Sequence, residues 1–79
     1  MDKFKERIEG WKRLAEILIL EGKNVFIKDN NGNLYFAKIA SKEDSKLFVD
    51  CFGPKQRAGQ KCPIYWVAIT HFDEYRGAA

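Results

Sequence analysis

The sequence is poor in the residues from which small domains build metal centres and disulfide frameworks. Its 79 residues include one histidine, His71, and two cysteines, Cys51 and Cys62. These side chains lack the Cys-x-x-Cys spacing of zinc sites, and two cysteines are too few for a secreted disulfide framework. We therefore expect no metal ion and no cofactor. In one interpretation the cysteines are small buried apolar residues, and in another, if their strands pair in register, they form a disulfide.

Long hydrophobic runs are missing as well. The apolar run Ile17–Leu20 is far shorter than the roughly 20 residues of a membrane-spanning helix or the hydrophobic core of a signal peptide. The first residues, Met1–Phe4, are charged rather than apolar. We therefore expect a cytoplasmic protein with no membrane partner.

The usual groups of catalysis are also scarce. His71 has no serine or cysteine partner in a recognisable motif, so a nucleophilic triad has no basis. Asp73 and Glu74 are adjacent, and neighbours on a strand point to opposite faces, which separates the two carboxylates. We therefore expect a protein that is not an enzyme.

Apolar and aromatic residues, by contrast, are abundant. They make up 46% and 14% of the chain, a composition typical of a folded globule, and the length fits a single domain over residues 1–79. The net charge is +3; residues 1–22 carry five basic and five acidic side chains, so the excess falls in residues 23–79. This excess favours an anionic partner, although a lysine-rich solvated surface has the same net charge.

Residues 1–22 have the spacing of an amphipathic helix. Gly22 is a typical helix end, because glycine adopts the left-handed conformation there without strain. Apolar side chains recur every three or four residues along one face of this segment: Phe4, Ile8, Trp11, Leu14, Ala15 and Leu18.

From residue 23 onward the apolar residues alternate, as in strands. We predict strands at 25–28, 34–40, 47–52 and 63–70, with 71–76 as a short 3₁₀ turn or an edge strand and 77–79 as a tail. Short connections indicate antiparallel pairing of consecutive strands. The predicted fold class is α+β, mostly β: an amphipathic N-terminal helix followed by a four- to five-stranded antiparallel meander, residues 23–76, curled into a small β-barrel.

The predicted sheet is apolar on both faces. Phe26, Phe36, Phe48 and either Tyr65 or Trp66 lie opposite the inner face, where a sheet with one wet face has polar residues. We therefore predict that the helix covers this second face, and that a partner covers whatever the helix leaves bare. The predicted inner face consists of Val25, Ile27, Tyr35, Ala37, Ile39, Leu47, Val49 and Cys51.

A helix that leads through Gly22-Lys23-Asn24-Val25-Phe26-Ile27-Lys28-Asp29 into Asn31-Gly32-Asn33-Leu34-Tyr35-Phe36-Ala37-Lys38-Ile39 resembles the Sm-like family of small β-barrels, the Sm, LSm and Hfq type. The resemblance covers residues 22–39. Arg76-Gly77 is similar to the Arg-Gly of the family's second motif. The family's Asp followed by Met-Asn near the third strand is absent, since residues 43–49 read Glu-Asp-Ser-Lys-Leu-Phe-Val. The resemblance implies a small barrel and favours RNA binding, without the side chains that usually contact the base.

The segment Lys55-Gln56-Arg57-Ala58-Gly59-Gln60-Lys61 is the strongest candidate site. It has three basic side chains and no acidic one, which suits phosphate groups. We predict that Lys55, Arg57 and Lys61 bind phosphates, and that Tyr35, Tyr65 and Lys38 form an adjoining surface. In the alternative interpretation the segment is a solvated hairpin connection whose charges protect a sheet edge.

These features predict a nucleic-acid-binding module with a preference for single-stranded RNA or DNA, because unpaired bases stack on aromatic side chains. The alternative is a protein–protein interaction or assembly module, a homo-oligomer among its forms, that uses an open strand edge or an aromatic patch.

Overall fold

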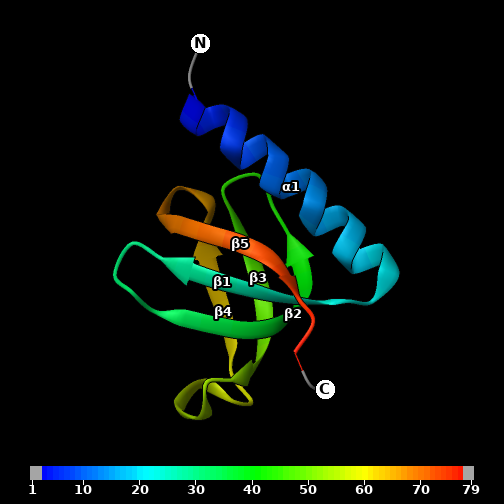
Figure 1. Cartoon of the computed structure of the whole chain (residues 1–79), viewed down its shortest axis with the longest axis vertical. Helices are drawn as coiled ribbons and strands as arrows, with labels where there is room; N and C mark the ends of the chain where they lie inside the picture. The colour runs from blue at the N-terminus through cyan, green and yellow to red at the C-terminus, as the bar shows by residue number, and fades with distance from the viewer. Residues whose placement is uncertain (1–2, 78–79) are drawn as a thin grey trace.

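The computed structural model describes residues 3–77 and has an α+β architecture that is mostly β (Figure 1). The first two residues of the predicted helix and the last two of the predicted tail lie outside the described residues. Within the described part, two short 3₁₀ helices, Lys55–Arg57 and Trp66–Ala68, precede the last two strands. The elements are α1 (Lys3–Glu21), β1 (Asn24–Asp29), β2 (Leu34–Lys42), β3 (Lys46–Gly53), β4 (Lys61–Tyr65) and β5 (Ile69–Tyr75). The α+β class, mostly β, with a helix before an antiparallel sheet, is confirmed, but only β1 to β4 follow one another as a meander, because β5 pairs with β1.

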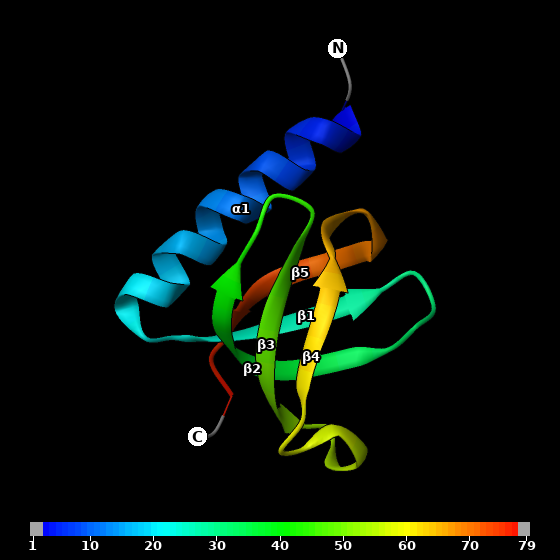
Figure 2. The same ribbon diagram turned by 180° about the vertical axis from the view of Figure 1, so that it is seen from behind.

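The five strands form one antiparallel sheet in the order β4-β3-β2-β1-β5. Two irregularities in the β2–β3 pairing, at Phe36/Ala37 and at Ile39/Ser41, bend the strands and increase their twist. Figure 2 shows the result, with β3 and β4 running across β1 and β5. Over the described residues β4 and β5 are the two edges and do not pair with each other. The sheet is therefore curled but open, and the predicted barrel is not confirmed.

The C-terminal end of α1 is closed by a glycine cap. Gly22 has a φ of 66°, and the amides of Gly22 and Lys23 donate to the carbonyls of Ile19 and Leu18 at 3.2 and 2.9 Å. These two bonds satisfy carbonyls that the helix itself leaves unpaired, and the positive φ turns the chain toward β1. The described part of the chain holds no helix that is both long and apolar enough to cross a membrane.

The hydrophobic core lies on the concave inner face of the sheet. Alternation along β1, β2 and β3 directs every second side chain inward. All eight residues that the sequence predicted for the inner face are buried, so this prediction is confirmed. The other strands add inward-facing side chains to the same core: Ile64, Trp66, Ile69 and Phe72.

Helix α1 packs against this inner face and not against the opposite one. Its buried residues Ala15 and Leu18 belong to the same core cluster, and the Trp11 ring lies 6.2 Å from that of Phe72. The predicted helical lid over the second face is therefore wrong. Helix α1 contacts β2 and β5 on this face, and its apolar stripe is buried against the core there.

The predicted fourth strand, 63–70, is also wrong in extent, because it breaks at Trp66. The chain has to pass there from one edge of the sheet to the other. The Trp66 amide donates to Ser45 O at 3.1 Å and the indole Nε1 to Glu43 O at 2.9 Å. These bonds turn the Trp66 side chain into the core. Residues 71–75 then continue as part of edge strand β5, one of the two alternatives predicted for them.

Candidate nucleic-acid interface

The basic segment between β3 and β4 is folded back on itself. The Arg57 amide donates to Pro54 O at 2.8 Å and the Gln60 amide to Arg57 O at 3.0 Å. Gly59, with a φ of 86°, donates its amide to Cys51 O at 2.8 Å. The segment is thus tied to β3 by its backbone, and the exposed Lys55 begins its 3₁₀ turn.

Arg57 does not extend into solvent as a phosphate ligand would. Its guanidinium carbon lies 4.6 Å from the centroid of the Tyr35 ring, in cation–π geometry. Its Nε atom is buried and has no hydrogen-bond partner among the described residues. The Arg57 guanidinium therefore packs on the Tyr35 ring rather than extending into solvent.

Tyr35 is part of a hydrogen-bonded network that shapes the β1–β2 turn. Its hydroxyl donates to Asp29 Oδ2 at 3.1 Å, and the amides of Asn31 and Asn33 both donate to Asp29 Oδ1 at 2.9 Å. Burial alone raises the pKa of Asp29, but the hydrogen bonds from Asn33, Asn31 and Tyr35 outweigh it and lower the pKa below its ordinary value. Burial and the hydrogen bond to Asp29 raise the pKa of Tyr35.

This network changes the role of Tyr35. The side chain is only 8% exposed, and Arg57 lies over its ring. The expectation that Tyr35 forms part of a binding surface beside the basic segment is therefore wrong, because the side chain is buried. Period-two alternation had already put Tyr35 on the inner face, so the two predictions made for this residue were incompatible.

The strand register gathers other predicted residues on the convex outer face. Lys38 on β2 and Lys61 on β4 both pair with Asp50 of β3, one from each side. Residues opposite each other in such pairs have Cβ atoms about 4.5–5.5 Å apart and share a face. All three side chains are exposed, so two predicted lysines flank one carboxylate across three strands.

An aromatic pair continues this surface along β3 and β4. Lys46 pairs with Tyr65, and its Nζ lies 5.3 Å from the Phe48 ring centroid and 5.6 Å from that of Tyr65. Tyr65 is 53% exposed. Phe48 is paired with Pro63, between the pair Lys46–Tyr65 and the pair Asp50–Lys61. We call this surface the outer strip, defined by Lys38, Lys46, Phe48, Lys61 and Tyr65.

Lys46 and Phe48 were not among the predicted site residues. Alternation places Lys46, Phe48 and Asp50 on one face of β3, a signal that the sequence does contain. Their alignment with β4, however, depends on a register that the long connection of residues 54–60 does not reveal in the sequence. Of the six predicted residues, the structure brings Lys38, Lys61 and Tyr65 together on the outer strip, and it leaves Lys55, Arg57 and Tyr35 apart from that strip.

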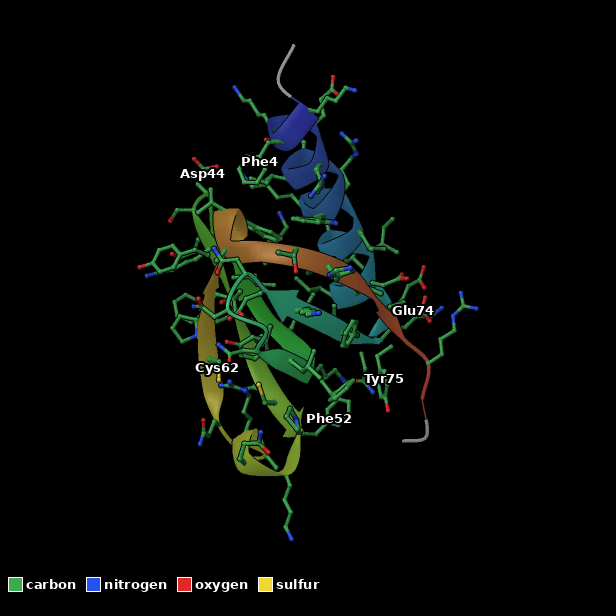
Figure 3. All side chains as sticks on the ribbon, turned by 60° about the vertical axis from the view of Figure 1, so that its left-hand side comes forward. Phe4, Asp44, Phe52, Cys62, Glu74 and Tyr75 are labelled. Carbon is green, nitrogen blue, oxygen red and sulfur yellow. The ribbon has the colours of Figure 1, made fainter. Side chains whose placement is uncertain are left out.

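A second group of aromatic side chains occupies the outer face of β1, β2, β3 and β5. The rings of Phe26 and Phe36 are 5.4 Å apart, those of Phe36 and Tyr75 5.0 Å, and those of Phe52 and Tyr75 5.8 Å. Figure 3 shows Phe52 and Tyr75 at the side of the molecule far from Phe4 and the start of the helix. The rings shield one another, which leaves Phe52 the most exposed, at 45%.

Neither a comparison with models of known protein families nor a search of the curated proteins finds a match to this chain.

Proposed function

We propose that the chain is a non-enzymatic nucleic-acid-binding module that holds single-stranded RNA or DNA on the outer strip. The observation that supports this most directly is the register that aligns Lys38, Lys46 and Lys61 with the rings of Phe48 and Tyr65. The outer strip has three lysines and only one neighbouring carboxylate, Asp50, so its net charge is positive, and its two rings provide flat apolar surface.

Single strands suit this surface better than a duplex. Unpaired bases expose their faces, and each base stacked on an aromatic side chain contributes about 1–3 kcal/mol. The outer strip presents rings on strands of a convex sheet, with lysines spaced between them for the phosphates. A duplex would instead require an element shaped to enter a groove.

The basic segment takes a smaller part in this proposal than the sequence suggested. Lys61 is its contribution to the outer strip, and Lys55 is exposed and free of the stacking that holds Arg57. Lys55 then serves a phosphate beyond the strip, and Arg57 acts by supporting the segment.

We extend the proposal to architecture and location. The helix followed by a curled five-stranded sheet supports an Sm-like relationship, with the open sheet as an incomplete form of the family's barrel. The two free thiols support a cytoplasmic location, where cysteines stay reduced.

Fluorescence anisotropy with a labelled oligothymidine tests the proposal. Affinity should fall as salt rises from roughly 50 to 200 mM, because each phosphate contact releases a counterion. Tyr65→Ala should weaken binding by about 5- to 150-fold, the equivalent of one lost stacking contact. Lys46→Gln and Lys61→Gln should each lower the salt slope by about 0.7.

Two matched variants on α1 are the controls. Arg13→Gln makes the same charge change on an exposed helical position, and Leu20→Ala removes an apolar side chain that is 80% exposed. Neither should alter affinity or slope. Absence of binding at the lowest salt, or binding without any salt slope, would end the nucleic-acid proposal.

The second candidate function is assembly with another protein chain. It is favoured by the open edges β4 and β5 and by the half-exposed aromatic group that ends in Phe52. An edge strand offers unpaired backbone groups to another strand. Light scattering distinguishes the candidates: a mass of two or more chains that Phe52→Ser reduces to one chain favours assembly, and a monomer leaves the outer strip as the better-supported surface.

A further inference from the structure

Two thiols lie in contact behind the basic segment. Cys51 is on the inner face of β3 and Cys62 on the inner face of β4, and their sulfur atoms are 3.7 Å apart. Cys51 is only 4% exposed, whereas Cys62 is partly exposed. The chain between them contains the basic segment, which returns to Cys51 through the Gly59 amide and the Gln60 carbonyl.

We propose that Cys51 and Cys62 are a reversible redox pair, which a low-molecular-weight disulfide such as oxidised glutathione converts into an intramolecular disulfide. This modification goes beyond nucleic-acid binding and does not depend on it. Bond formation requires the sulfurs to approach from 3.7 Å to about 2.05 Å. Cys62 lies on an edge strand that pairs with β3 alone, next to the glycine turn at Gly59, so it lies on the more adjustable of the two strands.

The surroundings of the two sulfurs define the order of the reaction. The Cys51 and Cys62 sulfurs are 3.7 Å apart, within hydrogen-bond contact, and Cys51 is the more deeply buried of the two. Burial raises the pKa of Cys51 to about 12, and the neighbouring Cys62 adds to the rise while the charge of Arg57 opposes it. Because thiolates and not thiols attack disulfides, the more exposed Cys62 reacts first.

The exchange then proceeds in two balanced steps. The Cys62 thiolate attacks one sulfur of the small disulfide, a mixed disulfide forms, and one thiolate leaves. Cys51 gives up its proton to solvent and attacks the Cys62 sulfur, which releases the second small thiolate. Two protein thiols are oxidised, one small disulfide is reduced to two thiols, and reduced glutathione reverses both steps.

The experiment uses the full chain in glutathione buffers of increasing oxidised fraction, quenched with acid and alkylated before mass analysis. The expected main product is a crosslinked single chain that takes up no alkyl group. Its mass is about 2 Da below that of the reduced chain before alkylation, because two hydrogen atoms are lost on crosslinking. In samples quenched early, the glutathione adduct should map to Cys62. Cys51→Ala should accumulate that adduct, whereas Cys62→Ala should be modified at a rate roughly tenfold lower, since only the buried sulfur remains.

Cys51→Ala removes a buried sulfur and weakens the core, so the order of attack is also measured in the unaltered chain. Mapping of early adducts in that chain needs no variant. Crosslinking that starts at Cys62 supports the redox pair. Glutathione adducts on both cysteines without a crosslink, disulfide-linked dimers, first attack at Cys51, or no reaction would each overturn it.

Discussion

Removal of the Leu18 side chain beyond Cβ should weaken the packing of the helix on the sheet and lower the stability of the fold. Leu18 is 1% exposed and belongs to the cluster that joins α1 to the inner face. A Leu→Ala change in such a core costs about 3 kcal/mol, from lost burial and from the cavity left behind. A domain of 79 residues has a total stability of about 4–12 kcal/mol. Leu18→Ala therefore removes a quarter or more of the whole.

Urea denaturation followed by tryptophan fluorescence measures this loss. With a slope of about 1 kcal/mol per molar urea, the unfolding midpoint should fall by about 3 M. Trp66 belongs to the core cluster and Trp11 of the helix packs against it, both beside the Phe72 ring, so their emission reports on this packing. Leu20→Ala is the matched control, because it makes the same chemical change two residues later on a side chain that is 80% exposed.

The control should change stability by less than about 0.5 kcal/mol, as exposed substitutions usually do. We expect a large difference in stability loss between these two identical substitutions on one helix. Equal losses for Leu18→Ala and Leu20→Ala would refute it, because they would mean that α1 does not bury the face assigned to it.

Three further predictions concern local features of the fold. Asp29→Asn should cost about 1–3 kcal/mol at neutral pH, as its four hydrogen bonds lose a charged acceptor. Because folding lowers the Asp29 pKa, the ionised carboxylate stabilises the folded state fully above the ordinary carboxyl pKa of about 4, and this stabilisation is lost as pH falls through the pKa of the folded state. The difference in unfolding free energy between the unaltered chain and Asp29→Asn should therefore be smaller at pH 3 than at pH 7. Gly22→Ala should cost about 1–2 kcal/mol in thermal unfolding, because alanine is strained at a φ of 66°; an unchanged melting temperature would contradict the cap. Trp66→Phe leaves a smaller aromatic ring in the core and removes the donor to Glu43 O, so it should cost at least about 1–3 kcal/mol in urea, whereas a loss below experimental error would contradict a contribution from this bond.

Local periodicity predicted a large part of this fold. Alternation identified the inner face of β1, β2 and β3, and the three-to-four spacing identified α1 with its glycine end. These patterns are reliable because each depends on the geometry of a single element. The side chains they placed inside, from Val25 to Cys51, are buried.

The arrangement of elements relative to one another was beyond local patterns. The sequence shows that two apolar faces exist, but not that the sheet curls, and the curl decides which face α1 covers. The irregularities at Phe36/Ala37 and Ile39/Ser41 produce part of that curl: the first lies opposite Gly53, whereas the second has no glycine or proline beside it in the sequence. The aromatic rings of Phe26 and Phe36 instead cover each other on the outer face.

The candidate site was predictable only in part for the same reason. The positive charges were visible as a run from Lys55 to Lys61, yet a linear run does not show that Arg57 turns inward onto Tyr35. Nor does it show that Lys61 lies across Asp50 from Lys38, because that alignment exists only once three strands are in register.

The most direct test of the outer strip is a titration of isotope-labelled protein with a single-stranded oligonucleotide, followed by NMR chemical shifts. We expect the largest shifts at Lys46, Phe48, Lys61 and Tyr65, and none along the solvent side of α1. Shifts concentrated on the helix, or an unchanged spectrum at millimolar oligonucleotide, would contradict binding at this surface.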